Sequence, residues 1–268
     1  MSKESNYLYH LVAFVTVAIW GPTFVSTKVL MLNGISPAQI FTLRFSIAYV
    51  LMLCFNHKRL FSDSWKDEAK MMLLGITGGS LYFLSENEAM NFTTATNTSL
   101  IVCSCPLFAT LLVRLVYKDT ARINTIQMLG SLLAFVGMAI VVLNGRFVLH
   151  LAPAGDALAF TACICWAFYS LLMKSASSHY GAAFITRKVF FYGVLTILPY
   201  YLIKPGFPSL TTLTQPVVLG NLLFLGCLAS MVCFLTWNWC ISKLGAVKAT
   251  TWVYFNPITT MIFASWVL

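Results

Sequence analysis

Apolar stretches long enough to cross a lipid bilayer alternate along this chain with short polar breaks. A membrane-spanning helix needs about 20 mostly apolar residues, because each residue adds about 1.5 Å and the apolar layer is about 30 Å thick. Stretches of this kind predict nine helices, at residues 7–32, 36–55, 70–91, 95–117, 124–144, 155–174, 182–203, 217–241 and 246–268. The breaks are too short to form a soluble domain. The pattern therefore predicts an all-α integral membrane protein whose chemistry lies inside a helix bundle.

The second part of the pattern repeats the first at a shift of 151 residues. The segment Ala95–Pro106 falls on Ala246–Pro257, and Asn87 falls on Asn238. A duplicated membrane unit explains this self-similarity, and internal repeats of this size are typical of secondary transporters. Because five predicted helices separate equivalent elements, an odd number, the second copy should be inverted in the membrane.

The repeats divide the chain into two predicted domains. Residues 1–144 hold a first repeat of five transmembrane helices, and residues 145–268 hold a second repeat of four. In the repeat alignment Leu268 falls on Tyr117, so nothing in the second copy matches the fifth helix. We therefore expect a tenth helix of about 27 further residues, missing from this chain. A natural nine-helix chain is the alternative.

Composition agrees with a membrane protein and indicates its orientation. The chain is 59% hydrophobic and 9% charged, against about 25% charged residues in soluble proteins. Its formal charge of +9 does not indicate nucleic-acid binding, because the basic residues lie between apolar stretches rather than on one surface. One set of connections carries Lys3, Lys58, Arg59, Lys66, Lys70, Lys118, Arg122, Lys174 and Lys243; the other carries Arg146 and Lys204. By the positive-inside rule the N-terminus is cytoplasmic.

Cysteine usage predicts neither a metal site nor a cofactor. All eight cysteines fall inside apolar stretches, where free cysteine behaves as a small apolar packing residue. We expect no metal, no cofactor and no structural disulfide.

Three prolines lie well inside predicted helices, at positions 22, 106 and 257. Proline lacks an N–H and crowds the preceding turn, so Pro22, Pro106 and Pro257 should each kink a helix and free a backbone carbonyl. A freed carbonyl at membrane depth is tolerated only against protein or a water-filled cavity. The kinks favour a central cavity, with simple bending for packing as the alternative.

Few charged residues fall inside the predicted spans. Arg44 lies about 10 Å into the second helix, and its repeat counterpart, with Thr42 aligned on Thr186, is Lys188. Glu86 lies inside the third helix, where it could meet Arg44 or carry a coupling proton. The alternatives are an outer-leaflet anchor for Glu86 and packing of Arg44 against helix-end carbonyls.

Aromatic residues recur in the helices that carry these kinks and charges. Aromatic faces bind apolar and cationic solutes. We therefore expect a substrate cavity near the membrane midplane, with Glu86 and Arg44 toward its outer side. Its predicted aromatic walls are Trp20, Tyr82, Trp166, Tyr169, Trp237 and Tyr254.

Motifs along nearly the whole chain resemble the EamA type of the drug/metabolite transporter superfamily. The matching residues are Trp20, Gly21, Phe24 and Lys28; Arg44; Ala89, Thr93 and Ala95; Pro106 and Phe108; Gly130 and Gly137; Gly155, Asp156, Trp166 and Tyr169; and Leu244, Gly245, Ala246 and Pro257. The resemblance implies two EamA-like repeats, a cytoplasmic N-terminus, a central pocket, and location in a plasma membrane such as the bacterial inner membrane.

The leading functional hypothesis is a secondary-active transporter that exports small metabolites, amino acids or amphipathic compounds by alternating access. Its partners would be membrane lipids, a small-molecule substrate and a coupling ion, for which protons are the candidate; a homodimer is a further hypothesis. The alternatives are a flippase for a lipid-linked substrate and a non-transporting membrane partner protein. Enzymatic activity is not expected, because His10, His57, His150 and His179 lie at span ends or in loops, away from any paired nucleophile.

Overall fold

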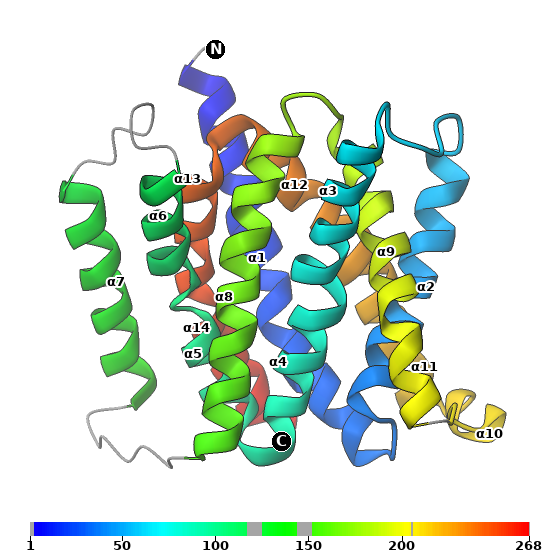
Figure 1. The fold of residues 1–268 in the computed structure, drawn as a ribbon. Coiled ribbons are helices and arrows are strands. Elements are labelled where there is room, and N and C mark those ends of the chain that lie inside the picture. The colour runs from blue at the N-terminus through cyan, green and yellow to red at the C-terminus, as the bar shows by residue number, and fades with distance from the viewer. Residues whose placement is uncertain (1–2, 117–124, 144–151, 205, 268) are drawn as a thin grey trace.

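The computed structural model of this chain describes residues 3–116, 125–143, 152–204 and 206–267. The basic residues Lys118, Arg122 and Arg146 and the predicted repeat boundary at 144 and 145 lie outside the described residues. The chain folds into a bundle of helices whose two chain ends lie at opposite ends of the bundle (Figure 1).

Each predicted span is helical over most of its described residues. The first half forms α1 (Lys3–Leu32), α2 (Pro37–Phe55), α3 (Trp65–Gly75), η1 (Ile76–Ser80), α4 (Leu81–Phe92), α5 (Ala95–Val102), α6 (Cys105–Val116) and α7 (Thr125–Leu143). The second half forms α8 (Pro153–Ala176), α9 (Ala182–Ile203), α10 (Leu210–Leu213), α11 (Pro216–Leu223), η2 (Phe224–Val232), α12 (Cys233–Leu244), α13 (Ala246–Thr250), η3 (Thr251–Phe255) and α14 (Asn256–Val267).

Six segments of the described chain form helices long and apolar enough to cross a membrane: Tyr7–Leu32, Pro37–Phe55, Ala95–Val116, Pro153–Ala176, Ala182–Ile203 and Pro216–Leu244. Together with the apolar exterior, they establish an all-α integral membrane fold. The other three predicted spans correspond to α3–η1–α4, to α7 and to α13–η3–α14, and their crossing of the membrane remains a prediction.

Polar residues at the start of α2 show how a helix boundary is encoded locally. Ser36 caps α2 by accepting a hydrogen bond from the Gln39 backbone N–H, and the Gln39 side chain accepts one in return from the Ser36 backbone N–H. Pro37 occupies the first turn, where its missing N–H costs nothing. Gly34 precedes the cap with φ of 83°, a conformation that glycine adopts without strain.

Two spans that the sequence pattern predicts as regular helices contain π-helical segments. These are η1 and η2, and both begin close to glycines that correspond in the two repeats, Gly75 and Gly226. A Cβ at Gly75 would lie 2.4 Å from the Cβ of Tyr192, and one at Gly226 would lie 2.8 Å from Ile47 Cγ2. The glycines therefore let the widened turns pack directly on neighbouring helices. Such π-helical turns are common near functional sites.

The regions before Pro106 and Pro257 are also irregular. Residues 103–104 separate α5 from α6, and the 3₁₀ segment η3 separates α13 from α14. Each proline then lies at the second residue of the following helix, a position where the missing N–H is tolerated. By contrast, α1 continues through Pro22.

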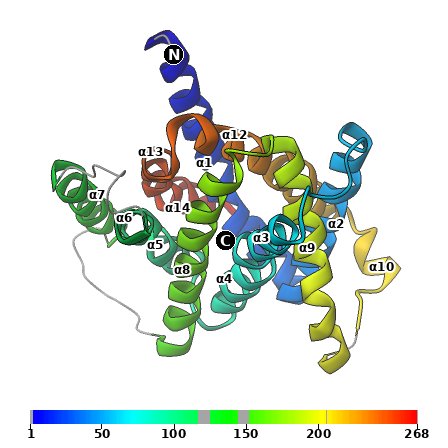
Figure 2. The same ribbon diagram turned by 45° about the horizontal axis from the view of Figure 1, so that its top comes forward.

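The helices differ in how fully they are enclosed. In two views α7 lies at the edge of the bundle, beyond α6 (Figures 1 and 2). No heavy atom of the described residues lies within 4 Å of a Cβ built at Gly130 or Gly137 of this helix. The part of α7 that packs against the core includes Ala134, Phe135 and Ala139.

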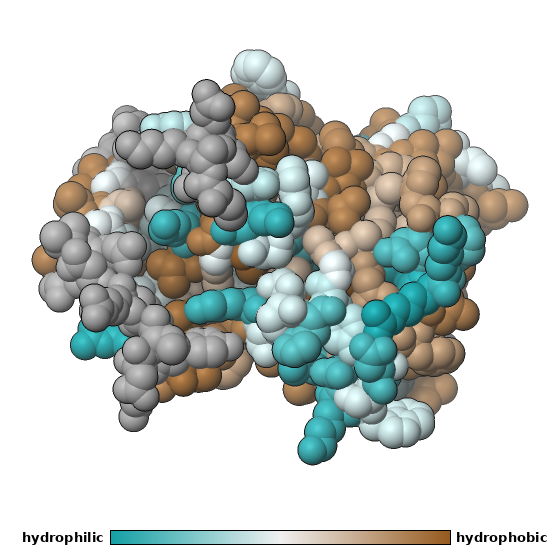
Figure 3. Space-filling view, turned by 90° about the horizontal axis from the view of Figure 1, so that it is seen from above, coloured by the Kyte–Doolittle hydropathy of each residue, from teal (hydrophilic) through white to brown (hydrophobic). Residues whose placement is uncertain are grey.

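Polar residues gather on the end of the bundle that holds the loop between α2 and α3, which Figure 3 shows from above. Exposed Lys58, Arg59, Asp63 and Lys66 lie in or next to this loop. Arg187 of α9 ties the loop to the bundle by donating hydrogen bonds to the backbone carbonyls of Asn56 and Arg59. The ordered loop thus belongs to the end that the positive-inside rule assigns to the cytoplasm.

Two helices that wall the centre, α1 and α14, pack closely against each other at Gly21. A Cβ at Gly21 would lie 1.8 Å from Thr259 Oγ1 and 2.9 Å from the backbone nitrogen of Thr260. The Thr260 hydroxyl donates a hydrogen bond of 3.0 Å to the Gly21 carbonyl. Glycine at this position therefore allows α14 to pack directly against α1 and to satisfy a backbone acceptor.

We predict that Gly21→Ala destabilises the protein by about 1–3 kcal/mol, because the added methyl group overpacks the contact between α1 and α14. Thermal unfolding in detergent, followed with a fluorescent maleimide that labels the buried cysteines as the bundle opens, measures the change. Gly130→Ala is the matched control, since its Cβ meets open space. Equal unfolding temperatures for Gly21→Ala and the wild-type protein would contradict the packing argument.

Candidate functional site

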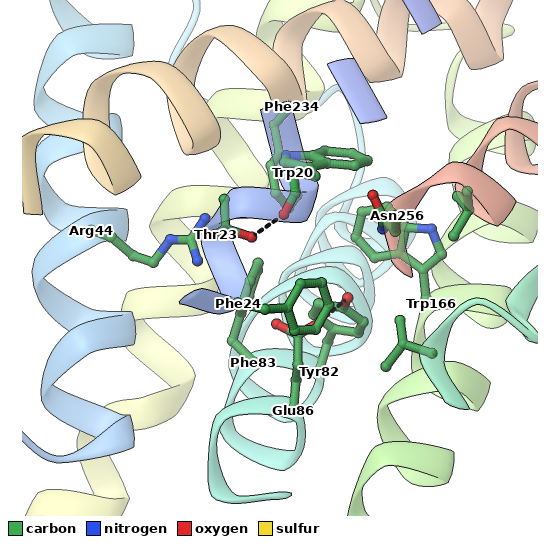
Figure 4. A pocket seen from close by; sticks show the side chains of 12 residues that line it. Trp20, Thr23, Phe24, Arg44, Tyr82, Phe83, Glu86, Trp166, Phe234 and Asn256 are labelled. Carbon is green, nitrogen blue, oxygen red and sulfur yellow. Dashed lines mark hydrogen bonds between the residues drawn. The ribbon is translucent and has the colours of Figure 1, made fainter. Parts of the chain in front are cut away.

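A small cavity lies at the centre of the bundle, where helices from both repeats meet (Figure 4). Its volume is about 30 Å³, enough for one or two water molecules. It is lined by Trp20, Thr23 and Phe24 of α1, Arg44 of α2, Tyr82, Phe83 and Glu86 of α4, Val102 of α5, Trp166 of α8, Phe234 of α12, Val253 of η3 and Asn256 of α14.

Aromatic rings from three helices form a continuous wall of the cavity. The ring centroids of Trp20 and Trp166 lie 5.5 Å apart, and those of Trp166 and Tyr82 lie 4.9 Å apart. The Trp20 indole N–H donates a hydrogen bond of 2.9 Å to the carbonyl of Ala229 in the π-helical segment η2. The irregular backbone of η2 thus fixes the orientation of a ring that faces the cavity.

Arg44 brings a positive charge to this largely aromatic centre. Its side chain is 1% exposed, and its Nε donates a hydrogen bond of 2.9 Å to the hydroxyl of Ser230. The guanidinium carbon lies 4.5 Å from the centroid of the Phe83 ring, a cation–π contact. Figure 4 shows the guanidinium pointing from α2 toward Thr23.

Glu86 is the carboxylate that lines the cavity, one helical turn after Tyr82. The Tyr82 hydroxyl donates a hydrogen bond of 2.5 Å to Glu86 Oε1. Glu86 is 5% exposed, and no nitrogen of Arg44 lies within the 4.0 Å ion-pair distance of its oxygens. The two charges therefore face one cavity without forming a direct ion pair.

A buried polar network lies beside the aromatic wall. The Tyr169 hydroxyl donates a hydrogen bond of 2.5 Å to Asn238 Oδ1, and the Asn238 amide donates one of 2.8 Å to the Thr186 hydroxyl. The three residues come from α8, α12 and α9. Because all three are fully buried, the network joins these helices without a water-filled space between them.

Of the predicted substrate-binding residues, Trp20, Tyr82, Glu86 and Trp166 line the cavity. Tyr169 and Trp237 do not line it; they pack behind Trp166, with ring centroids 5.0 and 6.3 Å away. Tyr254 does not line it either, although its neighbour Val253 does. Tyr254 lies in the 3₁₀ segment η3, where the helical periodicity assumed from the sequence does not hold.

The predicted intramembrane charges separate into two groups. Arg44 lines the cavity, whereas Lys188 lies outside it and forms an ion pair with Glu68. Glu68 lies in the first turn of α3, before the predicted span 70–91 begins. Burial opposes the negative charge of Glu68, but hydrogen bonds from Lys188 and the Tyr192 hydroxyl outweigh it and lower the pKa of this carboxyl to about 2. Lys188 therefore fastens α9 to α3 instead of facing a substrate.

Sequence reasoning missed several cavity residues: Thr23, Phe24, Phe83, Val102, Phe234, Val253 and Asn256. Four of them carried a usable signal in the sequence. Phe83 and Phe234 coincide in the repeat alignment, and a large residue retained in both copies at one depth is a reasonable candidate for the shared centre. Thr23 and Asn256 each adjoin one of the kink prolines.

The prolines themselves lie next to the cavity rather than in its lining. Thr23 follows Pro22, and its hydroxyl donates a hydrogen bond of 2.5 Å to the Trp20 carbonyl. Asn256 precedes Pro257 at the start of α14 and turns its amide to the cavity. The sequence positions next to Pro22 and Pro257 thus place short polar side chains at the centre. That Pro22 within α1 and the interruptions before Pro106 and Pro257 serve transport remains a prediction.

Within the described residues no group of three or more histidine, cysteine, aspartate or glutamate side chains could hold a metal ion. The eight cysteines are free thiols, and six of them are buried. The chemistry that the cavity offers is therefore non-covalent: aromatic surfaces, one cation, one carboxylate and short polar groups.

The EamA-like transporter family matches two segments of the chain, residues 8–143 and 153–268. A protein of Archaeoglobus fulgidus named an uncharacterized transporter is 26% identical over 98% of this chain and 90% of its own length. A probable terminal-alkyne amino-acid exporter of Streptantibioticus cattleyicolor is 24% identical over 98% of this chain and 85% of its own length.

A solved crystal structure has the same fold, with a TM-score of 0.75 over 98% of this chain and 89% of that chain, at 16% sequence identity. The relatives are named as transporters and not as enzymes. The family matches both halves of the sequence, around a central cavity that contains residues from both. The chain is a member of the EamA-like transporter family, within the drug/metabolite transporter superfamily.

Proposed function

We propose that this protein is a secondary-active transporter that exports small metabolites, amino acids or amphipathic compounds by alternating access. The observation that supports this most directly is the central cavity, which joins both repeats and combines aromatic walls with two buried charges. Secondary transporters built from repeats hold their substrates at such a position, where interrupted helices meet near the membrane midplane.

The size of the cavity supports a mechanism in which the helices move. A volume of about 30 Å³ is well below the roughly 300–1,000 Å³ typical of sites for small organic molecules. An amino acid therefore fits only after Trp20, Tyr82 and Trp166 separate. The structure corresponds to a state closed around the site, and the helix interruptions offer the points at which the halves can bend apart.

Export is the proposed direction, and the bacterial inner membrane with a cytoplasmic N-terminus is the proposed location. The named amino-acid exporter among the relatives supports the first. The basic residues Lys58, Arg59 and Lys66 next to the loop between α2 and α3 support the second.

The function is tested by measuring the flux of a panel of radiolabelled amino acids and small organic ions in proteoliposomes. We predict that a transported solute loses affinity by about tenfold or more in Trp166→Ala, because a wall of the site is removed. Phe168→Ala is the matched control, since this ring lies on the same helix but is 43% exposed on the outside. Unchanged affinity in Trp166→Ala would place the substrate elsewhere, and no flux of any solute would contradict transport.

Glu86 is the proposed proton carrier. We predict that Glu86→Gln reduces flux driven by a proton gradient at least about tenfold while substrate counterflow continues, because the amide keeps the shape of the side chain but cannot exchange a proton. Glu88→Gln is the control, since Glu88 is only half-buried and accepts a hydrogen bond from the Asn91 amide. Wild-type gradient-driven flux in folded Glu86→Gln would exclude this role.

The orientation is tested by cysteine labelling in a variant without the native cysteines. We predict that an impermeant maleimide added to intact cells labels Lys204→Cys but not Lys66→Cys, and that Lys66→Cys reacts once the membrane is opened. Both positions are exposed at opposite predicted sides of the membrane. The reverse pattern would overturn the cytoplasmic assignment of the N-terminus.

A further inference from the structure

We propose that Arg44 binds the carboxylate of the transported solute, so that the substrates of this protein are small carboxylates with an apolar or aromatic body. This inference rests on the proposed transport function and specifies the substrate class. It assigns to Arg44 the role of anchoring substrate and leaves the proposed proton-carrying role to Glu86.

The first step of the argument is the burial of an incompletely satisfied guanidinium. Arg44 is 1% exposed, and its Nη1 has no hydrogen-bond partner within the described residues. A buried charge with unpaired donors is costly, because it loses hydration without replacing it. A protein retains such a group where a bound anion can supply the missing partner.

The second step is that the protein's own carboxylates do not supply that partner. Glu86 lines the same cavity, but it accepts its hydrogen bond from Tyr82 and lies beyond ion-pair distance of Arg44. The ion pairs found among the described residues join Arg59 with Asp63, Lys70 with Asp67 and Lys188 with Glu68. Arg44 has no counterpart of this kind in the described part of the chain.

The third step is that the guanidinium is held in place while one edge stays available. Ser230 accepts a hydrogen bond from Nε, and the Phe83 ring lies against the guanidinium. These contacts fix the plane of the group, and Figure 4 shows it directed from α2 toward Thr23. A planar, oriented guanidinium suits a carboxylate, because both of its oxygens can accept parallel N–H bonds.

The remaining lining determines what the carboxylate is attached to. Trp20, Tyr82 and Trp166 present aromatic surfaces, which suit an apolar or aromatic body. Glu86 and the amide oxygen of Asn256, which is buried without a partner, could accept hydrogen bonds from an amino group. The shared chemistry is therefore a carboxylate, carried either by an amino acid or by a monocarboxylate without an amine.

Three compounds that share the same aromatic group distinguish an amino acid from a monocarboxylate without an amine. They are L-phenylalanine, 3-phenylpropionate and phenethylamine. We expect the wild-type protein in nanodiscs to be stabilised against heat by at least one of the two carboxylates, and not by phenethylamine. Stabilisation by L-phenylalanine alone identifies amino acids as the class, and stabilisation by both identifies carboxylates in general. Stabilisation by phenethylamine at the same concentration as the carboxylates, or by none of the three, overturns the role of Arg44.

Variants of Arg44 test whether this residue is responsible for the binding of the carboxylates. Arg44→Met should weaken carboxylate binding about tenfold or more, since it removes a charge-assisted hydrogen-bond donor. Arg44→Lys should recover part of it, because a lysine retains the charge without the planar pair of donors. Arg187→Lys is the matched control: Arg187 is also buried, at 2% exposure, but contacts backbone carbonyls of the loop after α2, so its conservative replacement should leave carboxylate preference unchanged.

The outcomes separate this inference from the proposed function. If the protein transports other solutes but does not bind either carboxylate compound, the transport function is supported and the proposed role of Arg44 is excluded. Equal carboxylate affinity in folded Arg44→Met and wild-type protein would do the same. If Arg44→Met does not fold, the comparison of the three compounds on the wild-type protein and on Arg44→Lys decides the matter.

Discussion

The structure depends on one constraint: inside a lipid bilayer every backbone N–H and C=O needs a partner within the protein. Continuous helices satisfy this automatically, and six segments of the described chain are helical over a length that can cross a membrane, with a break at residues 103–104 in one of them. Irregular backbone is tolerated only where other groups replace the lost hydrogen bonds. The carbonyls of Trp20 and Gly21 accept hydrogen bonds from the hydroxyls of Thr23 and Thr260. The carbonyl of Ala229 in η2 accepts one from Trp20.

This constraint gathers the irregular segments at the centre and so creates the site. A broken helix exposes short side chains and free carbonyls that would be costly against lipid, so the breaks turn inward. Thr23, Asn256 and the irregular segment η3 border the same cavity. Charges follow the same logic, because Arg44 and Glu86 are tolerated at this depth only among polar partners and aromatic rings. The need to satisfy buried backbone groups and the needs of a polar site therefore favour the same location, the centre of the bundle.

Much of the fold could be predicted from the sequence, because the bilayer imposes a length and an apolar pattern that are visible in any one chain. The spans around α1, α2, α8 and α9 follow directly from that pattern. The repeat alignment connects Pro106 with Pro257, and the helices are irregular before both prolines. The π-helical segments could not be predicted, since a single added residue in a turn depends on the close approach of Gly75 and Gly226 to other helices.

The site could be predicted only in part. Trp20, Tyr82, Glu86, Trp166 and Arg44 line the cavity as their depth in the spans suggests.

Tyr169, Trp237 and Tyr254 lie at suitable depths too, but they do not line it. Depth alone does not determine which side of a helix faces the centre, especially beyond an irregular turn. Lys188 illustrates another limit: it corresponds to Arg44 when Thr42 is aligned on Thr186, yet its partner is Glu68, near the loop. Equivalent positions in two repeats face different neighbours once the connections differ.

The central claim is that the cavity between Trp20, Arg44, Glu86 and Trp166 holds the substrate during transport. Site-directed alkylation during turnover tests it most directly, using Thr23→Cys in a variant without the native cysteines, with Thr161→Cys on the exposed side of α8 as the control. The account predicts that a saturating transported solute slows maleimide labelling at position 23 and leaves position 161 unaffected. Unchanged labelling at position 23 with a solute that is being transported would contradict it.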